Sequence, residues 1–152
     1  SSSITCASFD ENKSNLNLAI CLAFYLRDEN KRVFILDLTS NNKILKSFNF
    51  KNKISNFPNK NNSPFDTSIY YSKDPSFLSS KEFLEQESNK SYIIKIVDKV
   101  GYEPSSLKEV LSSKFYILIA TANKTKESDI LRFKEAIGEN IQNCIKTFFV
   151  VN

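Results

Sequence analysis

The residues with the clearest chemical potential are Lys13 and Ser14, which lie side by side at the start of a long apolar segment. A short β-like run at 3–7 precedes them, so the chain passes here from a strand through a tight loop into a helix. A lysine in that position is typical of a phosphate-binding site. The loop, however, contains Phe9, Asp10 and Glu11 where such a site requires glycine. Lys13 and Ser14 therefore mark either a nucleotide site or a similar fold in which such a site no longer binds its ligand.

The composition offers few of the residues that other kinds of catalysis or a metal site would need. The sequence has no histidine, which removes the commonest general base and any Ser-His or Cys-His pair. The three cysteines, Cys6, Cys21 and Cys144, lie far apart and form no CxxC pair, so we expect no metal site. We expect the cysteines to be small buried hydrophobic residues in a reducing cytoplasm.

Length and hydropathy indicate a single globular domain. The chain has 152 residues, of which 41% are hydrophobic and 25% charged. No apolar run approaches the ~18 residues of a membrane span, and no signal-peptide pattern is present, so we expect a cytoplasmic protein without a membrane span. A core strand stands at the very end of the sequence, and we therefore expect residues 1–152 to be one domain of a longer protein.

Apolar runs that alternate with helical patterns predict the elements that must position Lys13 and Ser14. Strands are expected at 3–8, 32–37, 91–97, 115–120 and 146–151, with a short edge strand at 69–71. Helices are expected at 16–26, 81–87, 104–112 and 126–137, with Gly138 just past the last one. Residues 38–66, rich in Asn, Lys, Ser and Pro, form a weaker region to which we assign no element. The alternation predicts an α/β fold of three layers, in which helices cover both faces of a doubly wound, mainly parallel sheet.

Four stretches of the sequence resemble, in order, those of the MinD/ParA family of deviant Walker A ATPases, which are P-loop proteins of the SIMIBI class. Residues 4–41, "ITCASFDENKSNLNLAICLAFYLRDENKRVFILDLTSN", are similar to the family's first strand, K-G-G-x-G-K-[ST] loop, helix and "GKRVLLIDxDxQ" strand. The others are "SYIIKIVDKVG" (91–101), "SKFYILIATANKTKESDILRFKEAI" (113–137) and "FFVVN" (148–152). The family domain is longer, so the resemblance implies a truncated P-loop NTPase-like fold. It also implies that strand 91–97 lies between strands 3–8 and 32–37.

The resemblance places the family's nucleotide-binding positions on five residues of this chain. Lys13 and Ser14 match the phosphate lysine and the magnesium-binding hydroxyl, and Asp98 is the best match for the Walker B aspartate, although it comes two residues late. Asp37 matches the first acid after the second strand, and Asn152 matches the asparagine that contacts the base. The remaining family positions are replaced: the second acid by Thr39, the signature lysine by Ser8, and the glycines by Phe9, Asp10 and Asn12.

These replacements weigh against a bound phosphate. Glycines let backbone N–H groups approach a phosphate in a nest geometry, and side chains at 9, 10 and 12 obstruct that approach. Asp10 and Glu11 also bring two negative charges toward a polyanion, against one positive charge from Lys13. A like-charge contact near a protein surface costs about 1–4 kcal/mol at ~4 Å. We therefore interpret the five positions as a vestigial nucleotide site.

The acids and the serine also have ordinary structural interpretations. Ser14 lies close enough to the helix start to serve as its cap. Asp37 and Asp98 each follow a strand, where the N-terminus of a nearby helix stabilises a carboxylate. Neither interpretation requires a ligand.

A second candidate surface lies at 43–60, in the sequence "KILKSFNFKNKISNFPNK". Lysines interleaved with aromatic residues are used to bind single-stranded nucleic acid, but arginine, the usual base reader, is absent from this stretch. Exposed phenylalanines need a cover, so we expect a protein partner here rather than nucleic acid. The residues of this possible partner surface are Lys43, Lys46, Phe48, Phe50, Lys51, Lys53 and Phe57.

These features favour a non-hydrolysing, MinD/ParA-like pseudo-ATPase without a cofactor. As the resemblance implies, it would act as a protein-interaction or positioning scaffold in a bacterial system such as a flagellum, a pilus, the division site or a plasmid. We expect a monomer, a weak homodimer, or pairing with an intact paralogue. Two alternatives stay open. One is a slow ATPase that uses ATP and Mg²⁺ with Lys13, Ser14, Asp37 and Asp98. The other is a DNA-associating partition-type module that uses the lysine-rich stretch.

Overall fold

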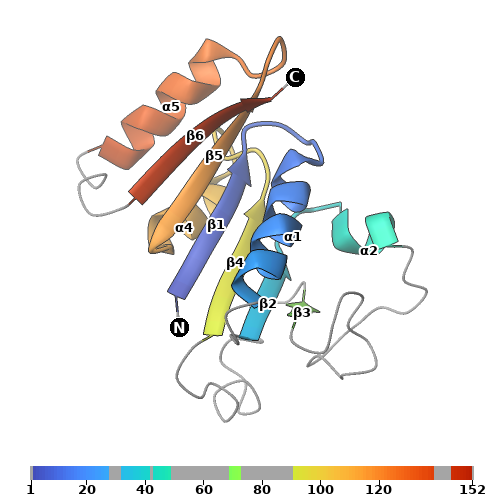
Figure 1. Cartoon of the computed structure of the whole chain (residues 1–152). Helices are drawn as coiled ribbons and strands as arrows, with labels where there is room; N and C mark the ends of the chain where they lie inside the picture. Colours follow the sequence, from blue (N-terminus) through green and yellow to red (C-terminus); the bar gives the residue numbers. More distant parts are fainter. Residues whose placement is uncertain are drawn as a thin grey trace.

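A computed structural model of the chain describes residues 2–27, 32–41, 43–48, 69–72, 91–138 and 145–151. Strands and helices alternate through most of these residues (Figure 1). The strands are β1 (Ser2–Ser8), β2 (Arg32–Asp37), β3 (Ile69–Ser72), β4 (Ser91–Val97), β5 (Phe115–Thr121) and β6 (Ile145–Val151). The helices are α1 (Ser14–Arg27), α2 (Lys43–Phe48), α4 (Pro104–Ser112) and α5 (Glu127–Ile137).

The strands form one sheet in the order β3-β2-β4-β1-β5-β6, and every neighbouring pair is parallel. This confirms the expected α/β fold with a parallel, doubly wound sheet. β4 lies between β1 and β2, as the resemblance implied, and the short strand expected at 69–71 is the edge strand β3 beside β2. Because all strands run the same way, their carboxyl ends meet at one edge of the sheet, where α/β proteins place their ligands.

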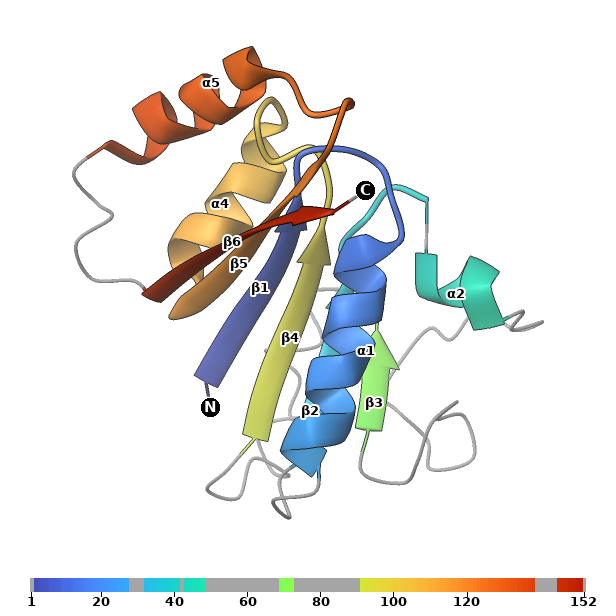
Figure 2. The same ribbon diagram turned by 45° about the horizontal axis from the view of Figure 1, so that its top comes forward.

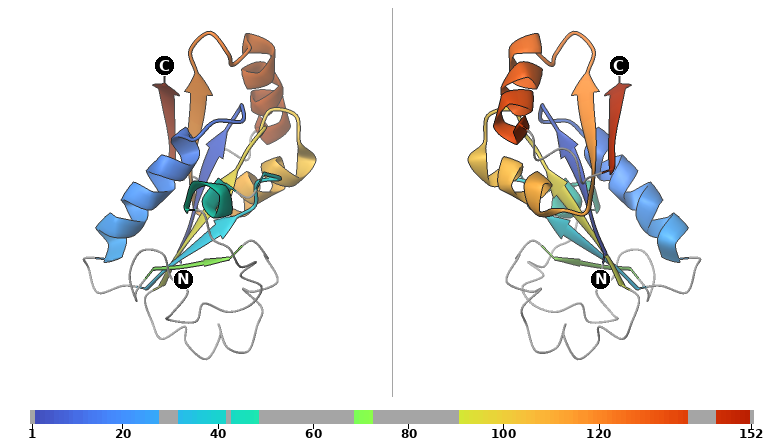
Figure 3. Two further views of the ribbon diagram at one scale, coloured as in Figure 1. Left: turned by 90° about the vertical axis from the view of Figure 1, so that its right-hand side faces the viewer. Right: turned by 90° about the vertical axis from the view of Figure 1, so that its left-hand side faces the viewer.

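Helices cover both faces of the sheet, with α1 on one face and α4 and α5 on the other (Figure 3). Side chains of consecutive strand residues alternate between these faces. Cys6 and Ile96 belong to the core cluster that contains residues of α1, whereas Ala7 and Val97 belong to the cluster that contains residues of α4 and α5. The sheet is therefore the middle one of three layers.

Helix α1 supplies the largest helical contribution to its face of the core. Leu16, Ala19 and Ala23 are buried against the sheet, because positions three or four residues apart lie on one side of a helix. Tyr25 is 68% exposed and Cys21 is exposed as well, so the helix has a distinct outer side. The expectation of buried cysteines holds for Cys6 and is wrong for Cys21; Cys144 lies outside the described residues.

The other predicted elements agree with the structure at most boundaries. Helix α4 has the expected bounds, and α5 ends where Gly138 takes a positive φ of 51°. Helix α2 was not predicted and falls within the region that we had left without an element. The helix expected at 81–87 lies outside the described residues. None of the helices in the described part of the chain is long and apolar enough to cross a bilayer.

Candidate functional site

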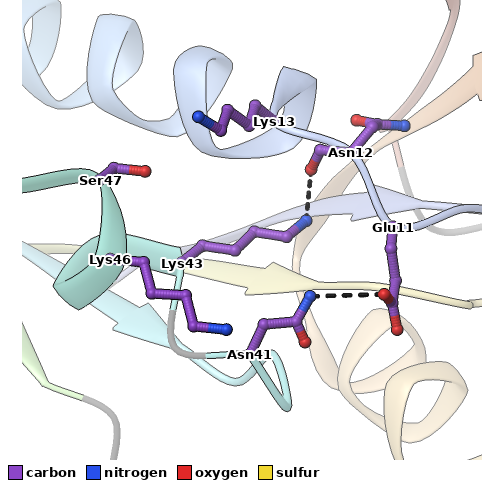
Figure 4. A pocket seen from close by; sticks show the side chains of 7 residues that line it. All are labelled: Glu11, Asn12, Lys13, Asn41, Lys43, Lys46 and Ser47. Carbon is purple, nitrogen blue, oxygen red and sulfur yellow. Dashed lines mark hydrogen bonds between the residues drawn. The ribbon is translucent and has the colours of Figure 1, made fainter.

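The loops that follow β1, β2 and β4 meet beyond the carboxyl edge of the sheet, beside the start of α1 and the short helix α2 (Figure 2). A pocket of about 250 Å³ opens between α1 and α2 (Figure 4). Its lining combines charged and amide side chains, namely Glu11, Asn12, Lys13, Asn41, Lys43, Lys46 and Ser47. The candidate phosphate lysine, Lys13, is therefore part of a real depression in the surface.

The first residue of the loop after β1 faces the core and not the pocket. The Phe9 side chain is fully buried and makes an edge-to-face contact with Phe133, with 5.7 Å between ring centroids. The Phe9 N–H donates to the Ile119 carbonyl at 3.1 Å, so it is unavailable to a ligand. The expectation that the Phe9 side chain itself blocks a phosphate is thus wrong. Phe9 is instead part of the hydrophobic core.

Asp10 is likewise turned away from the pocket. One of its carboxylate oxygens accepts a hydrogen bond from the Thr125 hydroxyl, and its N–H donates to Ser8 Oγ at 3.2 Å. The Asp10 carboxylate is therefore held against the loop between β5 and α5, which contains Thr125. Of the two acids expected to repel a polyanion, the pocket lining contains Glu11 alone.

Glu11 bridges the loops that follow β1 and β4. Its carboxylate lies 2.6 Å from Lys99 Nζ and also accepts a long hydrogen bond of 3.5 Å from Asn41 Nδ2. The hydrogen bond and charge of Lys99 lower the pKa of Glu11 from its usual range, so the carboxylate stays ionised near neutral pH. Lys99 reaches it from a left-handed backbone conformation with φ of 55°, which a non-glycine residue adopts only when its surroundings impose it.

Asn12 caps helix α1. Its Oδ1 accepts a hydrogen bond from the Ser14 N–H at 2.9 Å, which satisfies one of the free donors in the first turn. Its Nδ2 donates to Ser8 Oγ at 3.0 Å and to Thr121 Oγ1 at 2.8 Å. The cap is therefore Asn12 and not Ser14, and the side chain that replaces a family glycine here has a structural role.

Lys43 is the unexpected centre of the site. It is only 7% exposed, although we had grouped it with exposed lysines of a partner surface, and that assignment is wrong for this residue. Its ammonium group donates to Asp98 Oδ1 at 2.5 Å, to Asn15 Oδ1 at 2.9 Å and to the Asn12 carbonyl at 2.5 Å. Three acceptors match the three protons of the group. The lysine of α2 is thus bound at the junction of α1 and the end of β4.

Asp98 and Asn15 complete this buried cluster. Asn15 is fully buried, and its Nδ2 donates to Asp98 Oδ1 and to the Val97 carbonyl, each at 2.9 Å. Burial raises the pKa of Asp98, although the hydrogen bonds and charge of Lys43 and the Asn15 amide act in the opposite direction. The second carboxylate oxygen of Asp98, Oδ2, is buried and has no hydrogen-bond partner among the residues that the structure describes.

Asp37 is engaged in holding the β2–α2 connection. Its Oδ1 accepts from the Thr39 N–H at 3.1 Å and from the Thr39 hydroxyl at 2.5 Å, and its Oδ2 accepts from the Ile44 N–H at 2.9 Å. Both oxygens are therefore used by the chain itself.

These contacts do not fit a bound magnesium ion. Mg²⁺ prefers an octahedral shell of oxygen ligands, but one oxygen of Asp98 already holds an ammonium group and both oxygens of Asp37 hold protein donors. The arrangement can hold a cation, and that cation is Lys43.

The remaining predicted positions are only partly brought together. Ser14 begins α1 and Lys13 directly precedes it, and Lys46 is exposed on α2 at the same pocket as Lys13. Phe48 ends α2. Asn152, Phe50, Lys51, Lys53 and Phe57 lie outside the described residues. Sequence reasoning missed the roles of Asn12, Asn15 and Lys43. No local pattern separates Lys43 from the lysines that follow it, because its partners belong to other segments of the chain.

A solved plasmid partition protein from Borrelia burgdorferi matches this structure with a TM-score of 0.62 and 20% sequence identity, over 98% of this chain and 77% of that chain. This chain has the fold of that partition protein. At such low identity the likeness shows a ParA-like α/β fold and no activity. No protein-family model matches the sequence, and no curated protein matches it.

Proposed function

We propose that the chain is a non-hydrolysing pseudo-ATPase of ParA-like fold that acts as a protein-interaction or positioning scaffold in a bacterial system. The observation that carries this proposal is the buried ion pair between Lys43 Nζ and Asp98 Oδ1, at 2.5 Å. Asp98, the acid that directly follows β4, already holds the Lys43 ammonium group, and this contact makes the carboxylate unsuited to a metal ion. Lys43 also donates to Asn15 of α1, so these contacts link α2 to α1 and to the residue that follows β4.

The rest of the site supports the same proposal. The N–H groups of Phe9, Asp10 and Ser14 are hydrogen-bonded within the protein, so they cannot form part of a phosphate nest. Asp37 is fully engaged by Thr39 and Ile44. Of the matched positions in the described part of the chain, Lys13 lines the pocket and Ser14 begins α1. We infer that a domain of this fold without a working nucleotide site would serve by presenting a surface to another protein.

One observation favours the alternative of a slow ATPase. Asp98 Oδ2 is buried without a partner in the described part of the chain, and a buried unpaired carboxylate oxygen is costly unless something binds it. A magnesium ion that displaced the Lys43 ammonium would satisfy it. The two proposals differ in whether ATP turnover depends on Lys13.

Phosphate release from Mg-ATP by the purified chain tests the proposal, with Lys13→Ala as the comparison. We expect the two proteins to release phosphate at the same background rate, because no phosphate rests on Lys13. A fall of about tenfold or more in the variant would establish a live ATPase and contradict the proposal. Light scattering in the same samples should show no homodimer that forms only with Mg-ATP.

A further inference from the structure

The pocket between α1 and α2 carries two lysines whose charges are not neutralised. Lys13, at the start of α1, and Lys46, on α2, are both exposed and flank the pocket from opposite sides, with Lys43 between them (Figure 4). Among the residues that the structure describes, neither ammonium group has a carboxylate within ion-pair distance. The Ser47 hydroxyl also lines the pocket.

The other charges of the pocket are already balanced. Lys43 is paired with Asp98, and Glu11 is paired with Lys99 at 2.6 Å. The excess positive charge at the pocket therefore comes from Lys13 and Lys46. Charges with this arrangement attract an anion.

The size and donor set of the pocket decide which anion fits it. At about 250 Å³ it lies below the roughly 300–1,000 Å³ of most small-molecule and cofactor sites. Phosphate sites at a loop of this kind depend on free backbone N–H groups, and those of Phe9, Asp10 and Ser14 are already used. The side-chain donors that line the pocket include flexible ammonium groups and a hydroxyl, which suit a carboxylate side chain.

We infer that this pocket receives an aspartate or glutamate side chain from an acidic segment of a protein partner. The inference rests on the proposed function, since it uses the vestigial site as a docking point for protein. Lys13 and Lys46 would bind the two oxygens of the carboxylate from opposite sides, with the Ser47 hydroxyl as a further donor. Lys13, which matches the family's phosphate lysine in the resemblance, would thus take part in recognition of an acidic peptide.

The test uses a fluorescein-labelled peptide of alternating glutamate and serine, whose binding to the whole chain is followed by fluorescence anisotropy. The site variant is Lys13→Gln with Lys46→Gln. The matched control is Lys108→Gln with Lys124→Gln, two exposed lysines of α4 and the β5–α5 loop whose replacement changes net charge by the same amount. We expect the site variant to weaken binding about tenfold or more, as the loss of charge-assisted hydrogen bonds should. The control should lose less than about twofold.

Equal losses in the two variants would show that the peptide binds through net charge alone and would overturn the inference. So would the absence of saturable binding to the unaltered chain. A parallel titration with Mg-ATP separates this failure from failure of the proposed function. Binding of Mg-ATP that is lost in the site variant contradicts the pseudo-ATPase and makes the pocket a nucleotide site. Absence of both peptide and Mg-ATP binding contradicts the docking inference alone.

Discussion

A single side chain, that of Lys43, determines what the Asp98 carboxylate of the site can bind. Lysine is rarely buried unless it is paired, because an isolated ammonium group loses its hydration without compensation. Here its partners are a carboxylate, an amide oxygen and a carbonyl from three different residues. The sequence identified Asp98 as an acid at a strand end but could not pair it with Lys43. The two residues are 55 positions apart, and other lysines follow Lys43 closely.

The buried pair predicts a strong non-additive effect on stability. Lys43→Met leaves the Asp98 carboxylate buried and uncompensated, which should lower the free energy of unfolding by about 3–5 kcal/mol. Lys46→Met, on the same helix but exposed, should change it by less than about 0.5 kcal/mol. Adding Asp98→Asn to Lys43→Met should recover much of the loss, because the unpaired charge is gone. Urea unfolding of these variants measures the coupling, and simple additivity would refute the pairing.

The raised pKa of Asp98 predicts a pH dependence with a defined sign. The folded protein holds the Asp98 proton to higher pH than the unfolded chain does, so this residue makes stability fall as pH rises from its usual pKa of 3.8 through the raised value. Glu11 acts in the opposite sense: its pKa is lowered by Lys99, and its contribution is lost as pH falls through its usual range.

Urea unfolding at several pH values between about 3 and 7 tests this sign. The stability of the unaltered chain minus that of Asp98→Asn should decrease as pH rises. The same difference taken with Glu11→Gln should increase. A difference for Asp98→Asn that grew with pH would show that Lys43 and not burial dominates the Asp98 titration.

At the scale of elements, the sequence was sufficient to predict a helix or strand that is formed by its own apolar run. It was insufficient where an element depends on contacts with distant parts of the chain. Strand β2 is a nearly unbroken apolar run between covered faces, and α4 begins with a proline that favours a first helical turn. Helix α2 has only six residues and depends on the hydrogen bond from the Ile44 N–H to Asp37 and on burial of Ile44. No local pattern encodes those contacts.

Helix α1 predicts a contrast between its two sides. Leu16→Ala should lower the free energy of unfolding by about 2–5 kcal/mol, since Leu16 is buried among residues of β1, β2 and β4. Tyr25→Ala, on the outer side, should cost less than about 0.5 kcal/mol. Thermal or urea unfolding distinguishes these values. A cost below about 1 kcal/mol for Leu16→Ala would mean that α1 is not packed on the sheet as described.

The loop after β1 predicts that restoring a family-like glycine is harmful at one position and tolerated at the next. Phe9→Gly removes a fully buried ring that contacts Phe133 and should cost at least about 3–5 kcal/mol. Asp10→Gly removes one hydrogen bond from Thr125 and should cost about 1–2 kcal/mol. Comparable losses at both positions in urea unfolding would contradict the assignment of Phe9 to the core.

At the scale of the whole molecule, the parallel sheet brings three loops to one edge and so creates the site. The order of β2, β4 and β1 was implied by the family resemblance and is confirmed, because the apolar runs that carried the resemblance form these strands. The state of the site was harder to foresee. The lack of glycine at positions 9, 10 and 12 was visible in the sequence, whereas the contacts of the Lys43 ammonium group depend on where α2 places it relative to the loops after β1 and β4.

Titration calorimetry of the whole chain with Mg-ATP tests the central proposal, which is that the residues of this site bind one another and leave no place for a nucleotide. We predict no saturable heat at ATP concentrations up to about 1 mM, because Lys43 holds Asp98 and the N–H groups of Phe9, Asp10 and Ser14 are already hydrogen-bonded. A dissociation constant below about 100 µM that is lost in Lys13→Ala would show that the nucleotide displaces these contacts, and would contradict the account.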